Sequence, residues 1–261
     1  MKNYFTIGSL EIHYYGVIMA SAMLIGIFLT YFLSKKRDVK KEHIFDLALI
    51  ILPLAVLCAR AYYCIFSEHD YSFVEFWQIN KGGLAIYGGV IGGFIGVMIF
   101  CLIRKKNILA VCDILVPALI LGQALGRWGN FINQEAYGYA VTNPAWQFFP
   151  FAVYIEAEGA WHLATFFYES MWNLLTFVVL LITLIKCKKC GIPTALYLIL
   201  YGIGRVFIEG LRTDSLYLGN TGIRVSQLVS GALILVGIGI LIAVLVKNRR
   251  TKEDLSPDEK V

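Results

Sequence analysis

The stretch from Leu109 to Glu135, LAVCDILVPALILGQALGRWGNFINQE, places a polar run directly at the end of a hydrophobic segment. This run contains Arg127, Asn130 and Asn133 as well as the final glutamate. A charge at the centre of a bilayer costs about 2.5–3.5 kcal/mol on insertion scales, so an arginine beside an apolar segment usually marks a functional site. The forked guanidinium group suits phosphate or carboxylate. The stretch therefore predicts an anion-binding site in or beside a membrane.

The composition of the whole chain indicates a protein that crosses a membrane several times. Of its 261 residues, 58% are hydrophobic and 16% are charged, and the mean hydropathy is +0.68. Soluble domains carry about 25% charged residues. Apolar stretches near the ~20 residues that a spanning helix needs are expected at about 15–34, 46–65, 84–103, 109–127, 163–185, 192–208 and 224–246. We therefore predict an all-α, polytopic fold of seven transmembrane helices.

The positive charges predict the orientation of these helices. Most of the 23 lysines and arginines fall in clusters at 35–41, 104–106, 186–189 and 247–252, which follow the first, third, fifth and seventh apolar stretches. The positive-inside rule places such loops in the cytoplasm. The N-terminus is then outside and the C-terminus is cytoplasmic. A nucleic-acid patch would not alternate in this way, so we expect no nucleic-acid partner.

No internal repeat or low-complexity linker divides the chain. We expect one transmembrane domain over residues 1–250, with a long outer loop at about 128–162, and a disordered cytoplasmic tail over 251–261, which is polar and contains a proline. Aromatic residues in the outer loop favour anchoring at the membrane interface, with a substrate-contacting lid as the alternative. Glycines spaced by four residues in the third apolar stretch predict close helix packing: they are Gly88, Gly89, Gly92, Gly93 and Gly96.

Neither the cysteines nor the histidines predict a metal site. A structural zinc site needs about four ligands, and Cys187 and Cys190 form one isolated C-x-x-C pair. The histidines lack metal-ligand spacing, so we expect interfacial or solvated positions for them. They are His13, His43, His69 and His162. The chain also lacks a G-x-S-x-G elbow, a phosphate-binding Gly-Lys-Ser/Thr loop and a lysine in the seventh stretch, which disfavours a soluble-type hydrolase, a nucleotide enzyme and a retinal pump.

The predicted topology brings several polar residues to the outer side of the membrane. The fourth stretch runs outward and ends at Arg127, and the sixth runs outward through Arg205 towards Arg212. The first and third stretches run inward from near Tyr15 and Tyr87. All of these residues should therefore lie towards the same face.

The sixth stretch carries polar residues on one face of its helix. Tyr201, Arg205, Glu209 and Arg212 are spaced i, i+4, i+8 and i+11, which is an arc of roughly 80° at about 100° per residue. Arg205 and Glu209 can form an ion pair. Such a pair can simply hold the helix bundle together. Together with Arg127, however, it favours a site in which two arginines at one depth bind a phosphate diester.

The run Gly126-Arg127-x-Gly129-Asn130-Phe131-x-Asn133-x-Glu135-x-x-Gly138 resembles, over 13 positions, the best-known motif of the prolipoprotein diacylglyceryl transferase family. Similar segments follow in the expected order over nearly the whole chain. They are His13-Tyr14-Tyr15-Gly16, Gly83-x-x-x-Tyr87-Gly88-Gly89, Thr165-Phe166-Phe167-Tyr168-Glu169-Ser170 and Tyr201-Gly202-x-x-Arg205-x-x-x-Glu209-x-x-Arg212. The resemblance implies a multi-pass protein of the bacterial cytoplasmic membrane.

The chain departs from the pattern of this family at two places. Members usually carry a histidine before the paired glycines of the third helix, where this chain has Tyr87. They also commonly read His-Pro-Thr where this chain reads Leu163-Ala164-Thr165, with His162 one position away. If a histidine accepts the proton in the family, this protein must use another group.

The resemblance implies a reaction that moves the diacylglyceryl group of phosphatidylglycerol to the lipobox cysteine of a prolipoprotein signal peptide, and glycerol 1-phosphate leaves. No cofactor or metal is implied. Arg127 and Arg205 would stabilise the leaving phosphate. The candidates for taking the thiol proton are Glu135, Glu209 and Tyr87. Asn130 would orient headgroup oxygens, and the other substrate-binding candidates are Gly138, Tyr15, Tyr201, Asn133 and Arg212.

Two other functions stay open at this point. A transporter of a small anionic solute would also carry intramembrane arginines and a glycine-rich helix. Against it, the polar residues gather towards one face rather than the midplane, and no inverted repeat is visible. The missing family histidines favour the other alternative, a lipid-binding homologue that lacks transferase activity.

Overall fold

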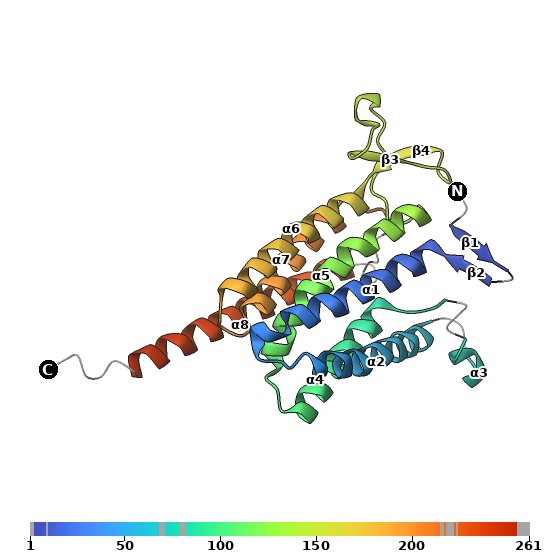
Figure 1. The fold of residues 1–261 in the computed structure, drawn as a ribbon. Helices are drawn as coiled ribbons and strands as arrows, with labels where there is room; N and C mark the ends of the chain where they lie inside the picture. The colour runs from blue at the N-terminus through green and yellow to red at the C-terminus, as the bar shows by residue number, and fades with distance from the viewer. Residues whose placement is uncertain are drawn as a thin grey trace. The chain divides into compact units, whose positions relative to one another are not determined.

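The computed structural model describes residues 3–8, 10–67, 71–78, 82–214, 217, 222 and 224–254. Within this part of the chain, seven helices are long and apolar enough to cross a membrane, which confirms the predicted fold class. They are α1 (Tyr14–Leu33), α2 (Glu42–Phe66), α4 (Ile86–Arg104), α5 (Ile108–Asn133), α6 (Thr165–Lys186), α7 (Ile192–Glu209) and α8 (Val225–Asp254), labelled in Figure 1.

Short elements that the sequence did not predict lie between the long helices. Two antiparallel hairpins pair β1 (Tyr4–Ile7) with β2 (Leu10–His13), and β3 (Ala152–Ile155) with β4 (Ala160–Leu163). Four-residue strands show too few alternations of polar and apolar residues to stand out in a sequence. Single helical turns complete the fold: η1 (Ser34–Arg37), α3 (Phe73–Phe76) and η3 (Pro144–Trp146).

Two predicted boundaries require correction. The fourth spanning helix, α5, continues past the expected end at Arg127 and ends at Asn133, so the outer loop begins at Gln134 rather than at residue 128. At the other end of the chain, α8 extends to Asp254. The first four residues of the expected tail are therefore helical, and residues 255–261 lie outside the described part.

The chain divides into two compact units, and the boundaries fall within α1 and α5. One unit comprises Met1–Leu29 and Leu115–Val261, which include both hairpins, most of α5, and α6, α7 and α8. The other comprises Thr30–Ile114, which include η1, α2, α3 and α4.

In the Thr30–Ile114 unit, glycines allow α4 to pack closely on α2. A side-chain carbon at Gly92 would meet the carbonyl oxygen of Leu54, and one at Gly96 would lie 3.0 Å from the Cα of Ile51. Gly88 is equally close to the backbone of α2. In a membrane, where apolar burial drives helix association weakly, such close approach is a main source of stability. The predicted packing role is confirmed for these three glycines, whereas Gly89 and Gly93 have no neighbour closer than 3.8 Å.

Two buried arginines support the ends of the same unit. Arg37 donates from Nε to Asp113 Oδ2 at 2.8 Å, and the two side chains are 2% and 0% exposed. Arg60 on α2 donates at 2.7–3.0 Å to the carbonyl oxygens of Glu75, Phe76, Gly82 and Gly83. The first contact joins η1 to α5, and the second attaches the segment before α4 to α2.

In the other unit, α6, α7 and α8 lie side by side (Figure 1). Gly202 faces α8, where a side chain would lie 2.9 Å from the carbonyl oxygen of Ser230. Gly204 faces the indole ring of Trp172 on α6. Deeper in the unit, Ile120 of α5 and Leu180 of α6 are fully buried in one apolar cluster.

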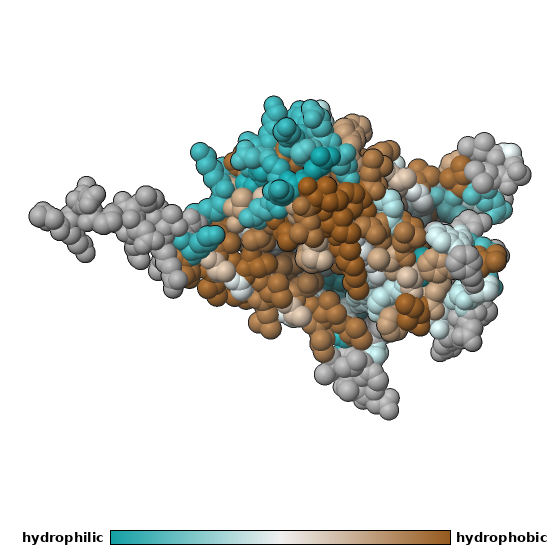
Figure 2. Space-filling model, turned by 90° about the horizontal axis from the view of Figure 1, so that it is seen from below, coloured by the Kyte–Doolittle hydropathy of each residue, from teal (hydrophilic) through white to brown (hydrophobic). Residues whose placement is uncertain are grey.

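Large hydrophobic side chains cover the outward faces of the helices, as Figure 2 shows for one face. Examples with more than 70% of their surface exposed are Leu49, Ile86 and Leu102 in one unit and Phe207 and Leu235 in the other. Soluble proteins rarely expose apolar patches this extensive. Together with the seven long apolar helices, this surface identifies a multi-pass membrane protein.

Candidate active site

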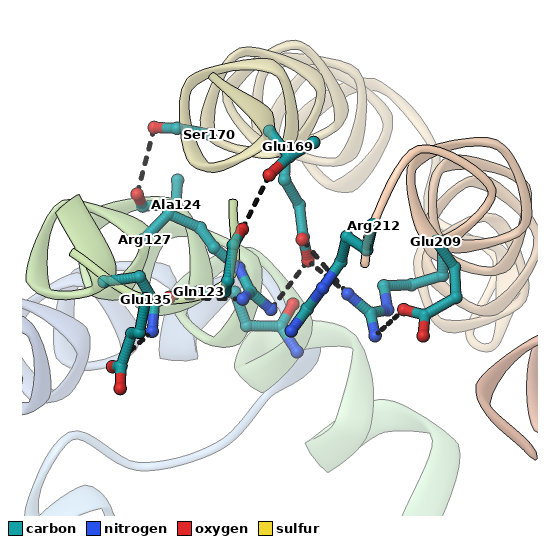
Figure 3. Close-up of polar contacts among 12 residues, drawn as sticks. Gln123, Ala124, Arg127, Glu135, Glu169, Ser170, Glu209 and Arg212 are labelled. Atoms are coloured by element: carbon teal, nitrogen blue, oxygen red, sulfur yellow. Dashed lines mark hydrogen bonds and ion pairs between the residues drawn. The ribbon is translucent and has the colours of Figure 1, made fainter. Parts of the chain in front are cut away.

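The guanidinium groups of Arg127 on α5 and Arg205 on α7 meet at one carboxylate, that of Glu169 on α6 (Figure 3). Arg127 Nη2 lies 2.8 Å from Glu169 Oε1, and Arg205 Nη1 lies 3.1 Å from Glu169 Oε2. The arginine side chains are 19% and 14% exposed, and the glutamate is 4% exposed. Two arginines from separate spans therefore do lie at one depth.

Arg205 also forms the predicted ion pair with Glu209. Its Nη2 lies 2.8 Å from Glu209 Oε2, one helical turn further along α7. The Glu209 side chain is 5% exposed. Two carboxylates therefore flank Arg205, whereas Arg127 has one carboxylate partner among the described residues.

The start of α6 sets the position of Glu169. The helix begins at Thr165, so Glu169 lies one turn into α6. The next residue, Ser170, donates to the carbonyl oxygen of Ala124 at 3.0 Å and accepts from the Trp128 indole at 3.2 Å. These two hydrogen bonds hold α6 against α5 beside the arginine, and Figure 3 shows the one between Ser170 and Ala124.

A second chain of contacts runs from Arg127 towards the end of α5. Arg127 Nη1 donates to Asn130 Oδ1 at 3.2 Å, and Asn130 Nδ2 donates to Glu135 Oε1 at 2.8 Å. Asn133 also donates to this oxygen, at 3.4 Å. Because α5 stays helical to Asn133, Arg127 and Asn130 lie one turn apart on the same face. The structure thus brings together four predicted site residues of the motif.

Arg212 lies just beyond α7 and points into the same region (Figure 3). It donates from Nε and Nη2 to the two oxygens of Asp214, at 2.9 and 2.7 Å. This hydrogen bond lowers the pKa of Asp214. Burial opposes the charge of Arg212, but the Asp214 carboxylate outweighs it and raises the arginine pKa. The charges of Arg205 and Glu209 also reach Arg212.

Gly138, a predicted substrate-binding residue, is a packing position in the structure. A side-chain carbon there would lie 2.8 Å from both the Leu163 Cβ and the Leu211 carbonyl oxygen. Its backbone pairs with that of Arg212 in an isolated bridge. Gly138 therefore joins the outer loop to the segment that carries Arg212.

The predicted tyrosines of this unit lie beside the arginine helices. The Tyr15 ring of α1 packs on Gly129, where an added side-chain carbon would overlap the ring. Tyr201 lies one turn before Arg205 on α7 and stacks on Tyr197, with ring centroids 5.6 Å apart. The Tyr197 hydroxyl accepts from Gln123 Nε2 at 3.1 Å. These contacts support the two helices that carry the arginines.

Tyr87 belongs to the Thr30–Ile114 unit, near the start of α4, and is 38% exposed. Its ring centroid lies 6.2 Å from that of Tyr62 on α2. No contact of Tyr87 tests a role in proton transfer, and that role stays a prediction.

The expectation of a solvated position is wrong for His162, and its alternative, a position at the membrane interface, stays a prediction. This residue of β4 is 7% exposed, its Nδ1 lies 2.8 Å from the Gly138 carbonyl oxygen, and its ring packs on Tyr137. His162 therefore supports the outer loop. His13 is exposed, as expected, and His43 is partly buried, whereas His69 lies outside the described residues. Within the described part, no three His, Cys, Asp or Glu side chains are grouped to hold a metal.

Sequence reasoning overlooked Glu169 as a site residue. It stands in a segment that resembles the family, but no role was assigned to it. The available signal was an acidic residue within an apolar stretch, which is expensive in lipid and therefore usually functional.

Comparison with known proteins gives a family for this arrangement. The model of the family described as prolipoprotein diacylglyceryl transferase matches residues 2–243. Phosphatidylglycerol–prolipoprotein diacylglyceryl transferase 1 of Clostridium perfringens is 42% identical over 256 residues, covering 96% of this chain and 97% of the relative. A relative of the same kind from Bacillus velezensis is 38% identical, with 97% and 96% covered. The chain therefore belongs to the prolipoprotein diacylglyceryl transferase family.

Proposed function

We propose that this protein transfers the diacylglyceryl group of phosphatidylglycerol to the lipobox cysteine of prolipoproteins. The observation that supports this function most directly is the meeting of Arg127 and Arg205 on Glu169 within an apolar bundle. The relatives that match nearly the whole chain are named for this reaction. A multi-pass membrane protein is also suited to both substrates, since a lipid and a signal peptide partition into the bilayer.

The reaction exchanges one bond at a glycerol carbon. The thiolate sulfur forms a bond to the carbon that bears the phosphate, the carbon–oxygen bond breaks, and glycerol 1-phosphate leaves with the electron pair. Negative charge builds on the departing phosphate. Guanidinium groups that are already fixed in a water-poor site stabilise such charge strongly, because their positive charges need no reorganisation during the reaction. Arg127 and Arg205 perform this task, and Asn130 orients headgroup oxygens beside Arg127.

The thiol must lose a proton, because its ordinary pKa is about 8.5 and the thiolate is the nucleophile. Three candidates keep this role. Glu209 is buried and forms an ion pair with Arg205. Glu135 is exposed and accepts hydrogen bonds from two asparagines. Tyr87 stands where the family usually has histidine.

We expect the site to lie towards the outer side of a bacterial cytoplasmic membrane. Arg127 and Glu209 lie near the C-terminal ends of α5 and α7, and Glu169 lies near the start of α6. The basic cluster at 186–189 lies at the other end of α6, about 26 Å from Glu169 along the helix. With that cluster in the cytoplasm, the site faces the side where the signal-peptide cysteine emerges.

A purified-protein assay tests the proposal. Protein, phosphatidylglycerol and a lipobox peptide are combined in detergent, and mass spectrometry should find the diacylglyceryl mass on the peptide but not on a peptide with serine for cysteine. Arg127→Ala should lower the rate about 10²-fold or more. Arg104→Ala, which removes an exposed arginine paired with Asp46, should not. No mass gain with folded protein would contradict the proposal.

Two further assays separate the alternatives. Complementation of a transferase-depleted bacterium distinguishes an active enzyme from a homologue that only binds lipid. Solute uptake into proteoliposomes without lipid consumption would instead indicate a transporter.

A further inference from the structure

Glu169 contacts both arginines of the site from the helix that lies between them. The carboxylate forms an ion pair with Arg127 through Oε1 at 2.8 Å, and it accepts hydrogen bonds from Arg205 through both oxygens, at 3.1 and 3.3 Å. The side chain is 4% exposed, and its neighbour Ser170 ties this turn of α6 to α5. Three helices thus meet at one charge.

The charges around this carboxylate balance before any lipid binds. Arg127 and Arg205 contribute two positive charges, and Glu169 and Glu209 contribute two negative ones. The headgroup phosphate of phosphatidylglycerol adds a further negative charge. Like charges close together disfavour each other, so Glu169 must weaken the attraction of the two arginines for the lipid.

The gain from Glu169 is geometric. A guanidinium group has five N–H donors, and the described contacts of Arg127 use its two terminal nitrogens, towards Glu169 and Asn130. Its remaining donors are held in a fixed direction. A long side chain that is mobile before the substrate binds loses conformational entropy when the substrate orders it. A group already fixed stabilises developing charge without that cost.

We infer that Glu169 is a positioning residue that fixes Arg127 and Arg205 for the leaving phosphate and competes with the lipid for their charge. The inference rests on the proposed function for its kinetic part. Glu169 accelerates the chemical step at the expense of ground-state lipid affinity. A group that only stabilised the fold would affect neither quantity in this way.

Glu169→Gln separates the two effects because it keeps the shape and removes the charge. The site then carries one more positive charge, so the KM for phosphatidylglycerol should fall. The two arginines are less well fixed, and a misplacement of about 1 Å can cost about 10²-fold in rate, so kcat should fall about 10- to 100-fold. Loss of correctly folded protein lowers the apparent kcat but cannot lower KM.

Two variants complete the comparison. Glu169→Asp keeps the charge but withdraws it by one methylene, so kcat should fall while KM stays near that of the wild type. Glu158→Gln removes a carboxylate from the exposed β3–β4 turn, where it accepts from Tyr137, and should change neither constant.

Equilibrium binding of phosphatidylglycerol in zwitterionic detergent provides a measure that does not depend on turnover. Glu169→Gln should bind the lipid at least as tightly as the wild type, and tighter as ionic strength falls. Weaker binding by this variant, or wild-type kcat in either Glu169 variant, would overturn the inference. Should Glu169→Gln not fold, the aspartate variant decides. A wild type that binds the lipid but transfers nothing would refute the proposed function, while the binding comparison still judges Glu169.

Discussion

Arg127→Lys tests whether the shape of the guanidinium group, and not only its charge, is required. Arg127 uses separate nitrogens for Glu169 and Asn130, at 2.8 and 3.2 Å. A lysine keeps the positive charge but ends in a single compact ammonium group, which does not reproduce a planar fork. The variant should therefore keep one of these contacts and lose the other.

The contact that lysine cannot make sets the size of the expected effect. A hydrogen bond to a charged group is worth about 1.5–3 kcal/mol, and each 1.36 kcal/mol corresponds to a factor of ten in rate. If the lost contact supports the transition state, kcat should fall about 10- to 150-fold. Because the charge is kept, the KM for phosphatidylglycerol should change much less.

The lipobox-peptide assay measures both constants as the concentration of phosphatidylglycerol is varied in mixed micelles. Arg104→Lys is the matched control, since Arg104 forms an exposed ion pair with Asp46 and such pairs contribute about 0–1 kcal/mol. Transfer by this control should equal that of the wild type. If Arg127→Lys also matched the wild type, charge alone would suffice, and the reasoning from two separate contacts would be refuted.

Three further predictions concern stability and pH, and thermal unfolding in detergent measures each. Gly92→Ala should cost about 1–3 kcal/mol, because the new carbon meets a backbone carbonyl of α2, whereas Gly93→Ala, with its nearest neighbour 4.0 Å away, should unfold like the wild type. Arg37→Met removes the cation beside buried Asp113 and should lower the free energy of unfolding by about 3–5 kcal/mol. Adding Asp113→Leu should restore most of this stability. If it restored none, the two residues would not form a coupled pair. The pKa of Asp214 is lowered by its arginine partner, so its stabilising contribution is present above its ordinary value of 3.8 and is lost as pH falls through the lowered value. At neutral pH, Asp214→Asn should therefore lower the free energy of unfolding by less than about 1 kcal/mol, so it should unfold at a slightly lower temperature than the wild type. This difference should vanish in acid.

The seven spanning helices could be predicted because each needs only its own residues. A membrane helix satisfies its backbone hydrogen bonds internally, so length and hydropathy suffice to locate it. The ends are less well defined. Polar Arg127, Asn130 and Asn133 marked the end of an apolar stretch, but α5 continues to the last of them, because the helix can run beyond the apolar layer.

Part of the site followed from helical periodicity. The four-residue spacing of Arg205 and Glu209 predicted their pair, which is present at 2.8 Å. Glu169 was missed because its partners lie 42 and 36 residues away along the chain, on other helices. The surroundings of Gly138 leave no room for a side chain, and its role in substrate binding stays a prediction.

The sequence by itself determined which segments enter the membrane and which helix faces are polar, because both depend on residues close together in the chain. Only the tertiary structure decided that one buried carboxylate would join the arginines of α5 and α7. The reason is that an ion pair between helices depends on the rotation and depth of each helix. Those are set by packing contacts, such as Tyr15 on Gly129 and Trp172 on Gly204, that no local pattern encodes.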